Sequence, residues 1–355
     1  MSKSYKIAVV AGDGIGPEVV AEGLKVLKVA SELGGFQYET KEFPYGSEHY
    51  LATGELMPDE AFDEIRGFDA IYLGAIGDPR VEVGLVERAV IAGLRFKLDL
   101  FVNLRPIKLW SENVCPLKGK KPEDIDFIVV RENTEDAYAG IGGHLKKGTP
   151  DEVALQEMIY TRKGVERVIR YSFELCRKRN KQKKLTLVDK ANAIRAMDIW
   201  TRTFEEVGAE YPDIERDHAY VDAACMWMVK SPEAFDTVVT ANLFGDIITD
   251  LGAMLQGGMG VAASGNIHPG QVSMFEPIHG SAPKYKGQGT ACPVAAISAV
   301  QMMLDYLGES DVADKIENAI ATLTQSGRIK SFDARSGLSS VECGDMIAEQ
   351  LAASK

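Results

Sequence analysis

Two aspartates, Asp246 and Asp250, stand four residues apart in the segment NLFGDIITD. On a helix this spacing places both carboxylates on one face, about one turn apart. Adjacent carboxylates repel each other unless a cation lies between them, and their hard oxygen atoms suit Mg²⁺ or Mn²⁺. The alternative is an ordinary helix start, where acidic residues are favoured by the helix dipole. Asp222, in the strand-like segment YVDAACM, is a third candidate metal ligand, with a capping role as its alternative.

Three arginines occur in apolar surroundings, where a solvated charge is not expected: Arg95 in GLRFKLDLF, Arg105 in VNLRPIKL and Arg131 in FIVVREN. Arginine is costly to bury without a partner, and its guanidinium fork matches a carboxylate. Internal salt bridges with Asp99, Glu132 or Glu135 would also explain them. Three such arginines together favour a site for a substrate with several carboxylates.

Lysine and tyrosine side chains in two other segments could transfer protons. Lys190 follows a strand-like run in LVDKANA, and Tyr138 ends RENTEDAY. Each would need a pKa tuned by its neighbours. A surface lysine and a half-buried tyrosine are the alternatives. Among the five histidines, His279 in FEPIHGSAP has the most suggestive setting, and no histidine shows the spacing of a zinc site.

Short β-rich runs alternate with helical patterns, which predicts an α/β protein with a largely parallel sheet. The expected strands are 5–10, 69–73, 126–130, 185–188 and 236–240. A helix is expected after Pro17, ending at Gly34 and Gly35. The first strand enters a GxGxG pattern followed by proline, which is not the GxGxxG of a dinucleotide-binding turn. The glycine-rich, polar segment 140–157 is expected to form a protruding hairpin or arm.

Composition limits the partners and the compartment. A net charge of −12 argues against a nucleic-acid or anionic-membrane surface. Five scattered cysteines without a CxxC pair suit a reducing compartment. The N-terminal apolar run is too short for a signal peptide, and no stretch approaches the roughly 18 apolar residues of a membrane span. These observations predict a cytoplasmic protein that binds neither membrane nor nucleic acid.

Seven segments, read in chain order, resemble those of the β-hydroxyacid oxidative decarboxylases: GDGIGPE, NLRP, VVRENTEDAY, VDKAN, YVDAACM, NLFGDIITD and FEPIHGSAP. This family includes the isocitrate, 3-isopropylmalate, homoisocitrate and tartrate/D-malate dehydrogenases. The match runs from about residue 5 to about residue 310. The segment CPLKGKKPEDIDFIVVRENTEDAYAGIGG is most similar to tartrate/D-malate dehydrogenase, so a metal-dependent, NAD(P)-linked oxidation and decarboxylation of such a small 2-hydroxy diacid is the first expectation.

The resemblance implies a two-domain isopropylmalate/isocitrate dehydrogenase-like fold rather than a Rossmann fold, with a central mixed sheet flanked by helices. Residues 1–100 and 257–355 would form a large cofactor-binding domain, and residues 101–256 a small domain for dimerisation and substrate binding. The active site would lie in the cleft. The arm near 140–157 resembles the clasp between subunits in the family. The chain would form a homodimer in which each subunit donates Lys190 and Asp222 to its partner's site.

The resemblance also implies a role for each candidate residue. Arg95, Arg105 and Arg131 would hold the substrate carboxylates. Asp246 and Asp250, with Asp222 of the partner, would hold Mg²⁺ or Mn²⁺. Lys190 would assist removal of the hydroxyl proton, and Tyr138 would supply the proton at C3. The implied cofactor-binding residues are Ile15, Asn192, His279, Gly280, Ser281, Ala282, Lys284, Tyr285, Cys292 and Arg335.

Two departures from the family pattern concern specificity. Members that use NAD commonly carry Asp-Ile where this chain has Lys284-Tyr285, and a lysine there would attract a 2′-phosphate. Together with Arg335 this favours NADP over NAD. Cys292 stands where asparagine is usual beside the adenine.

The second departure lies in the helix 86–95, which would contact the C3 substituent. It has Ala89 and Ile91 where isocitrate enzymes have serine and asparagine. Isopropylmalate enzymes have glutamate and two leucines at the positions of Arg88, Ile91 and Ala92, and tartrate/D-malate enzymes have tryptophan at Arg88. Arg88 would lie near the substrate or pair with Glu82 or Glu87. The alternatives to tartrate or D-malate are 3-isopropylmalate, then isocitrate or homoisocitrate. A non-catalytic regulatory subunit is disfavoured because the tyrosine, the lysine and all three aspartates are present.

Overall fold

The computed structural model describes residues 3–334 and 336–354. The chain divides into two compact units: a first unit of Met1–Leu100, Arg105–Ile125 and Ala253–Lys355, and a second unit of Phe101–Leu104 and Asp126–Gly252. Residues 105–125, which the sequence resemblance placed in the small domain, lie in the first unit. The reason is local, because the Lys108 backbone N–H donates to Gln256 Oε1 at 2.9 Å within that unit.

A mixed sheet forms the centre of the first unit. In spatial order its strands are β2 (Gln37–Glu42), β1 (Ser4–Gly12), β3 (Ala70–Ala75), β12 (Ser273–Pro277) and β11 (Ala263–Ile267). Neighbouring strands are parallel except β11 and β12, which are antiparallel. Every residue of β3 is buried, as expected of a parallel strand with a continuous apolar sequence. The strand β4 (Val102–Lys108) has residues in both units.

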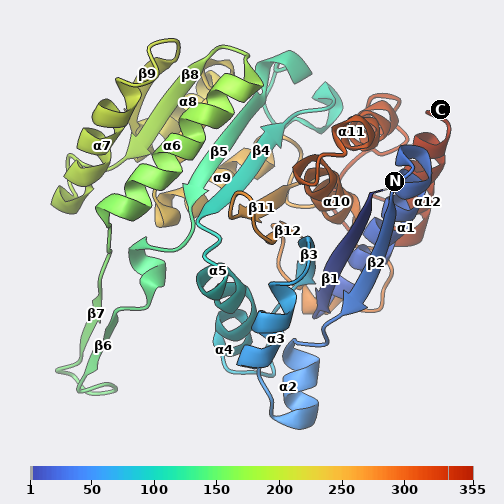
Figure 1. The fold of residues 1–355 in the computed structure, drawn as a ribbon, viewed down its shortest axis with the longest axis horizontal. Coiled ribbons are helices and arrows are strands. Elements are labelled where there is room, and N and C mark those ends of the chain that lie inside the picture. The colour runs from blue at the N-terminus through green and yellow to red at the C-terminus, as the bar shows by residue number, and fades with distance from the viewer. Residues whose placement is uncertain (1–2, 335, 355) are drawn as a thin grey trace. The chain divides into compact units, whose positions relative to one another are not determined.

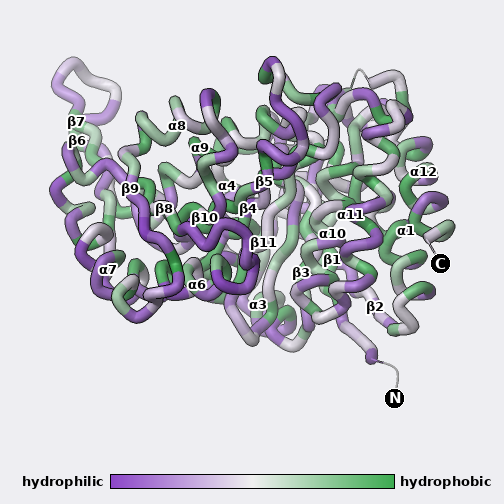
Figure 2. The backbone as a smooth tube through the Cα atoms, turned by 90° about the horizontal axis from the view of Figure 1, so that it is seen from above, coloured by the Kyte–Doolittle hydropathy of each residue, from purple (hydrophilic) through white to green (hydrophobic). Residues whose placement is uncertain are grey.

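Four long helices of the first unit pack against one another (Figure 1). They are α1 (Gly16–Gly34), α10 (Val294–Tyr306), α11 (Ser310–Gln325) and α12 (Ser340–Ala352). The first two of them, α1 and α10, also pack against this sheet. Hydrophobic and hydrophilic residues alternate along α1 (Figure 2), which buries one face. The shorter elements are α2 (Ser47–Thr53), α3 (Asp59–Ile65), α4 (Leu85–Glu87), the π-helical turn η1 (Arg88–Ala92), α5 (Gly93–Lys97) and the 3₁₀ turns η2 (Glu112–Val114), η3 (Pro122–Asp124) and η7 (Pro283–Tyr285).

The second unit is built on four parallel strands in the order β5 (Asp126–Glu132), β10 (Thr237–Thr240), β8 (Lys184–Asp189) and β9 (Glu215–Tyr220). Its helices are α6 (Arg162–Arg179), α7 (Asp198–Gly208), α8 (Val221–Lys230) and the start of α9 (Asn242–Leu255). The 3₁₀ turns are η4 (Asp136–Ala139), η5 (Arg195–Met197) and η6 (Pro232–Ala234). Large aromatic side chains, including Trp200, Phe173 and Phe204, fill its core.

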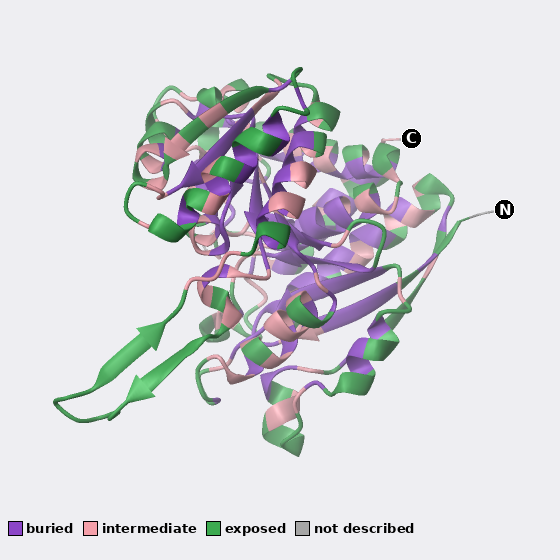
Figure 3. Ribbon diagram, turned by 60° about the vertical axis from the view of Figure 1, so that its left-hand side comes forward, coloured by how far each residue is buried: buried purple, intermediate pink, exposed green. Residues whose placement is uncertain are grey.

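The segment expected to form an arm is an antiparallel hairpin of β6 (Gly142–Leu145) and β7 (Val153–Gln156). Both strands are exposed along their whole length (Figure 3). Its exposed side chains include Leu145 and Leu155, at 63% and 58% exposure. A two-stranded hairpin is marginal by itself in water, so such exposed apolar side chains usually have a binding partner.

The five expected strands correspond to β1, β3, β5, β8 and β10, and the expected first helix is α1, which has proline in its first turn and Gly35 as its C-cap. The α/β class is therefore confirmed. Asp222 is the exception to the expected local structure, because YVDAACM runs from β9 directly into the first turn of α8. In the described part of the chain, none of the helices is both long enough and apolar enough to cross a membrane.

Candidate active site

Arg131, Tyr138 and Asp246 form a compact cluster in the second unit. The Arg131 guanidinium is 1% exposed and donates through Nη1 to Asp246 Oδ1 at 2.5 Å. The Tyr138 hydroxyl donates to Asp246 Oδ2 at 3.0 Å, and its ring lies 5.2 Å from the Arg131 guanidinium carbon. Both carboxylate oxygens of Asp246 are thus oriented by residues that the sequence singled out. Asp246 itself stays 40% exposed and accessible to a ligand.

Strand order brings this cluster together. Arg131 is the penultimate residue of β5 and pairs with Thr240, the last residue of β10, after which the chain turns into α9. Asn242, at the start of α9, accepts from Arg131 Nε at 3.0 Å through Oδ1. A side chain at Gly245 would approach Arg131 to 2.4 Å, so glycine is needed where α9 packs on the arginine. Asp250 lies one turn beyond Asp246 on α9 and is exposed.

Lys190 and Asp222 form a separate pair in the same unit. Lys190 Nζ lies 2.7 Å from Asp222 Oδ1, and this hydrogen bond lowers the pKa of the aspartate. The lysine also lies over the Tyr220 ring, 5.8 Å from its centroid. Beneath it, the fully buried Asp189 accepts from the Ala191 backbone N–H and contacts His218 Nε2, both at 3.0 Å. This buried carboxylate fixes the turn that presents Lys190.

The three aspartates do not converge within one chain. Among residues 3–334 and 336–354 there is no cluster of three histidine, cysteine, aspartate or glutamate side chains that could hold a metal ion. Asp246 and Asp250 supply hard oxygen atoms one helical turn apart on an accessible face of α9, and this donor set fits Mg²⁺ or Mn²⁺.

Glu132, immediately after Arg131, is an unusual buried acid. Its carboxylate accepts from the Thr134 backbone N–H and hydroxyl, both at 2.8 Å, and from the Glu135 N–H at 2.9 Å. Burial outweighs these bonds and raises its pKa to about 7. Because the pKa is higher in the folded state than in the unfolded chain, its contribution to stability is complete below pH 4.5 and is lost as the pH rises through 7.

We therefore expect Glu132→Gln to flatten the pH dependence of stability. Between pH 5 and pH 8 the urea midpoint of the wild type should fall, whereas that of Glu132→Gln should fall less. The exposed Glu157→Gln serves as the matched control and should follow the wild-type curve. Parallel curves for the wild type and Glu132→Gln would show that Glu132 does not hold its proton in the folded state.

The arginines of the first unit have different environments. Arg95 Nη2 donates to the buried Glu276 Oε1 at 2.9 Å, and Asn266 Nδ2 donates to the same oxygen at 2.7 Å. Arg105 is buried in β4. Arg88 is exposed in the π-helical turn η1 and, among the described residues, forms no ion pair with Glu82 or Glu87.

Several expected cofactor residues come together where β1 meets α1. The Ile15 N–H donates to the Ser281 carbonyl at 2.9 Å, and a side chain at Gly14 would approach that oxygen to 1.9 Å. The N–H groups of this turn therefore bind protein, not a phosphate, which agrees with a fold other than Rossmann. The Nε2 atom of His279 is buried and has no hydrogen-bond partner among the described residues, and burial lowers the pKa of the ring. Ala282 has a left-handed φ of +40° that sharpens the loop after Gly280.

The remaining cofactor candidates are more scattered. Lys284 is exposed, with Nζ 4.7 Å from the centroid of the Tyr285 ring, and Cys292 is half-buried. Asn192 is exposed in the turn after β8. It belongs to the second unit, whereas the other described candidates belong to the first. Arg335 lies outside the described residues.

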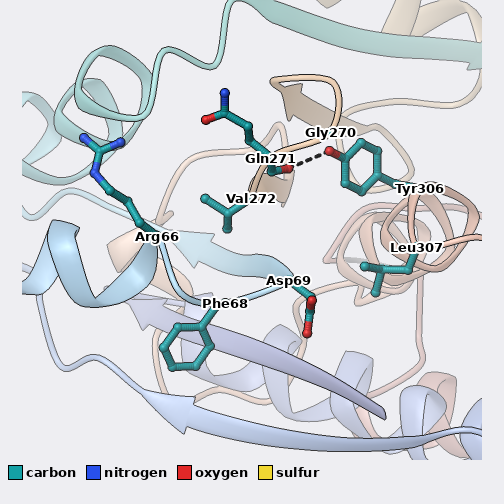
Figure 4. Close-up of a pocket in the computed structure, with 8 residues that line it drawn as sticks. All are labelled: Arg66, Phe68, Asp69, Gly270, Gln271, Val272, Tyr306 and Leu307. Atoms are coloured by element: carbon teal, nitrogen blue, oxygen red, sulfur yellow. Dashed lines mark hydrogen bonds between the residues drawn. The ribbon is translucent and has the colours of Figure 1, made fainter. Parts of the chain in front are cut away.

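A separate cavity of about 600 Å³ opens at the amino ends of β3 and β12 (Figure 4). Its lining residues are Arg66, Phe68, Asp69, Gly270, Gln271, Val272, Tyr306 and Leu307. Tyr306 closes one side by donating to the Gln271 carbonyl at 2.6 Å. In parallel sheets ligands bind beyond the carboxyl ends of the strands, so this cavity lies at the end where a site is not expected.

Sequence reasoning missed several residues that support these sites. Glu276 is a buried acid in the apolar strand β12. An acidic residue inside an apolar run is the sequence feature that could have revealed it. Asn242 gave no signal, because asparagine at a helix start is ordinary. His218 and Asp189 become partners only when β8 and β9 pair side by side.

The comparisons with known proteins agree with the motifs. Residues 6–349 match the family model described as isocitrate/isopropylmalate dehydrogenase. The chain is 51% identical to a 3-isopropylmalate dehydrogenase of Thermobifida fusca, over 99% of each chain. It is 50% identical to a 3-isopropylmalate dehydrogenase of Frankia casuarinae, over 89% of this chain and 92% of the relative. The crystal structure of isocitrate dehydrogenase from Methylococcus capsulatus superposes with a TM-score of 0.88 at 35% identity, covering 98% of this chain and 99% of that one.

These findings correct the expected substrate. The expectation of a tartrate/D-malate dehydrogenase was wrong, because relatives that match the chain over nearly its full length are 3-isopropylmalate dehydrogenases. The expectation rested on the segment around RENTEDAY. In the structure that segment forms β5 and the η4 turn and carries Arg131 and Tyr138, both of which contact Asp246.

The fold, the ordered motifs and the full-length similarity point to one assignment. Enzymes of the matched family act on small hydroxy acids and generally use Mg²⁺ or Mn²⁺ with an NAD- or NADP-type cofactor. The chain belongs to the isocitrate/isopropylmalate dehydrogenase family and is an oxidoreductase of the decarboxylating dehydrogenase type.

Proposed function

We propose that the protein oxidises and decarboxylates 3-isopropylmalate. The observation that carries this proposal is sequence identity: about half of all aligned residues, over most or nearly all of the chain, are identical to those of 3-isopropylmalate dehydrogenases. The segment 86–95 supports it, because the half-buried Ile91 and Ala92 offer apolar surface and no hydrogen-bond donor of the serine or asparagine type. An isopropyl group suits such a surface, whereas a third carboxylate would lose its hydration there without gaining a partner.

The residues divide the work by their chemistry. Arg95, Arg105 and Arg131 would bind the two substrate carboxylates. Lys190 would accept the proton of the substrate hydroxyl as hydride leaves C2, and Tyr138 would donate a proton to C3 after CO₂ departs. Asp246 and Asp250, with a third aspartate from a partner, would hold Mg²⁺ or Mn²⁺, which when bound supplies Lewis-acid stabilisation of negative charge on the substrate oxygen. The nicotinamide, when bound, supplies the hydride acceptor.

We propose NADP as the preferred cofactor. Lys284 is exposed beside Tyr285, in the loop that follows the expected cofactor residues 279–282. A lysine in this place would attract a 2′-phosphate, whereas an aspartate would repel it. The neighbouring Lys286 is engaged by Glu48 at 2.5 Å, which leaves Lys284 as the cation of this loop best able to meet a phosphate.

A substrate and cofactor panel tests both proposals. The purified enzyme is assayed with 3-isopropylmalate, isocitrate, tartrate and D-malate, each with NAD⁺ and NADP⁺. We expect kcat/KM to be highest for 3-isopropylmalate by about 10-fold or more, since burying an isopropyl group contributes about 1–3 kcal/mol to discrimination. NADP⁺ should be preferred. A clear preference for isocitrate would defeat the substrate proposal, and a strong preference of the unmodified enzyme for NAD⁺ would defeat the assignment of Lys284.

We also propose a homodimer in which Lys190 and Asp222 serve the partner's site. Support comes from α8, where Met226, Trp227 and Val229 are 72%, 47% and 45% exposed, and from the exposed apolar side chains of the β6–β7 hairpin. Surfaces of this kind mark interaction sites. All five cysteines are free in the structure, in keeping with the reducing cytoplasm as the place of action.

Mixed dimers distinguish shared sites from sites within one chain. Lys190→Met and Tyr138→Phe each should be nearly inactive alone. If Lys190 serves the partner's site, a dimer of one variant chain with the other contains one intact site and one site that lacks both groups. Unfolding and refolding the two variants together gives about half mixed dimers, each with one of its two sites intact. Activity should therefore recover toward one quarter of the wild-type value. No recovery, with mixed dimers present by differential tagging, would place both residues in the same site.

A further inference from the structure

Asp136 is buried in a backbone conformation that glycine adopts far more readily than any other residue. Its φ is +68° and its exposed fraction is 0%. Aspartate tolerates the left-handed region better than most residues, but the conformation is still strained. Its backbone N–H donates to the Ile159 carbonyl at 2.8 Å, which holds the turn. Strain of this kind persists only where surrounding contacts enforce it, and it concentrates at functional sites.

The side chain of Asp136 connects three segments of the second unit. Oδ1 accepts from the Ala137 N–H at 2.8 Å and from the Tyr160 hydroxyl at 3.1 Å. Oδ2 accepts from the Leu243 N–H at 2.9 Å. Leu243 lies in the first turn of α9, 107 positions away in the sequence. The strained conformation therefore allows one carboxylate to reach both its own turn and a distant helix.

The helix α9 has no cap of its own. The Gly245 N–H bonds to the Ala241 carbonyl at 2.9 Å, so Ala241 occupies the N-cap position. An alanine side chain cannot accept a hydrogen bond from the first turn. The Asp136 carboxylate takes that role, and its negative charge also interacts favourably with the positive end of the helix dipole. A second bond, from Asn242 Nδ2 to the Glu135 carbonyl at 3.2 Å, joins the same two segments.

The two segments that Asp136 joins carry the two partners of the Tyr138–Asp246 hydrogen bond. Tyr138 follows Asp136 within the η4 turn, and Asp246 follows Leu243 in the first turns of α9. We propose that Asp136 is a positioning residue that sets the start of α9 against the η4 turn and thereby holds the Tyr138 hydroxyl on the Asp246 carboxylate. This role rests on the proposed function, in which Tyr138 and Asp246 take part in catalysis.

Asp136→Gly tests the proposal, because glycine relieves the backbone strain while removing both acceptor oxygens. We expect kcat to fall by about 10- to 100-fold, the effect of a small displacement of reacting groups, with KM changed by less than about 3-fold. Hydrogen exchange followed by mass spectrometry should show faster exchange in the first turn of α9, residues 242–246. Asp136→Asn keeps one acceptor oxygen and the same backbone tolerance, and should give an intermediate kcat even if the glycine variant folds poorly.

Two further variants separate positioning from general stability. Tyr160→Phe removes the side-chain donor to Asp136 but leaves the Leu243 bond, so its kcat should stay within about 3-fold of the wild type. Ala241→Ser in the Asp136→Gly background gives α9 a cap of its own. It should restore slow exchange in residues 242–246 and recover part of kcat. The same substitution in the wild type should change little.

The outcomes divide clearly. Unchanged kcat in Asp136→Gly, or unchanged exchange at 242–246, overturns the positioning role. A restored cap in the double variant without any recovery of kcat also overturns it, because capping and catalysis would then be independent. A wild type inactive on every substrate of the panel defeats the proposed function instead, and the exchange measurement still decides whether Asp136 holds α9.

Discussion

Asp246→Asn is expected to lower kcat by about 10³-fold while the fold survives, because the Lewis-acid contribution of a bound metal is worth several kcal/mol. Asp246 is the residue on which three interactions converge: the Arg131 guanidinium at 2.5 Å, the Tyr138 hydroxyl at 3.0 Å and the proposed cation. Asparagine retains an oxygen that can accept from Arg131, so the buried guanidinium keeps a partner. It removes the negative charge that attracts the cation.

The measurement combines steady-state kinetics with chelation. EDTA should abolish the activity of the wild type, and Mg²⁺ or Mn²⁺ should restore it. Asp198→Asn on α7 is the matched control, because the Asp198 carboxylate forms an exposed ion pair with Arg202, and this substitution should leave kcat unchanged. Circular dichroism and thermal unfolding verify the fold of each variant. Full activity after chelation would refute the metal assignment of Asp246 and Asp250.

Tyr138→Phe should lower kcat by about 10²- to 10⁴-fold, the range for loss of a positioned proton donor. Phenylalanine keeps the ring that lies 5.2 Å from Arg131 and removes only the hydroxyl that reaches Asp246. Because the tyrosine is 40% exposed, its loss should affect stability little. KM for the hydroxy acid should change far less than kcat, since in the proposed function the arginines and not the tyrosine would bind the carboxylates.

The control for this variant is Tyr211→Phe. Tyr211 stacks on Phe173 in the core of the same unit, at 4.7 Å between ring centroids, and has no proposed part in the reaction. Both variants lose one phenolic hydroxyl, so only the position of the hydroxyl differs. If kcat of Tyr138→Phe stayed within about 5-fold of the wild type, proton donation at C3 would have to be assigned to another group or to water.

The sequence by itself determined five of the strands, the first helix and most of the chemical groups. Apolar β-rich runs such as AIYLGA can only be buried parallel strands in a chain of this composition, and the structure has β3 there. Residue type also indicated the chemistry: carboxylates for a hard cation and arginines for carboxylates. The order of seven motifs identified the family, which the comparisons confirm. It did not identify the substrate, because the motifs carry groups that every member of the family needs.

Only the tertiary structure decided which of these groups act together. Arg131 meets Asp246 across 115 positions because β5 and β10 are neighbours in the sheet, and Arg95 meets Glu276 across 181 positions. Neither partner was among the acids that the sequence offered for these arginines. Asp136 likewise caps a helix that local sequence leaves with alanine at its start. The physical reason is the same in each case. Residue type and spacing determine local conformation, whereas hydrogen bonds between distant residues depend on strand order, which the local pattern does not encode.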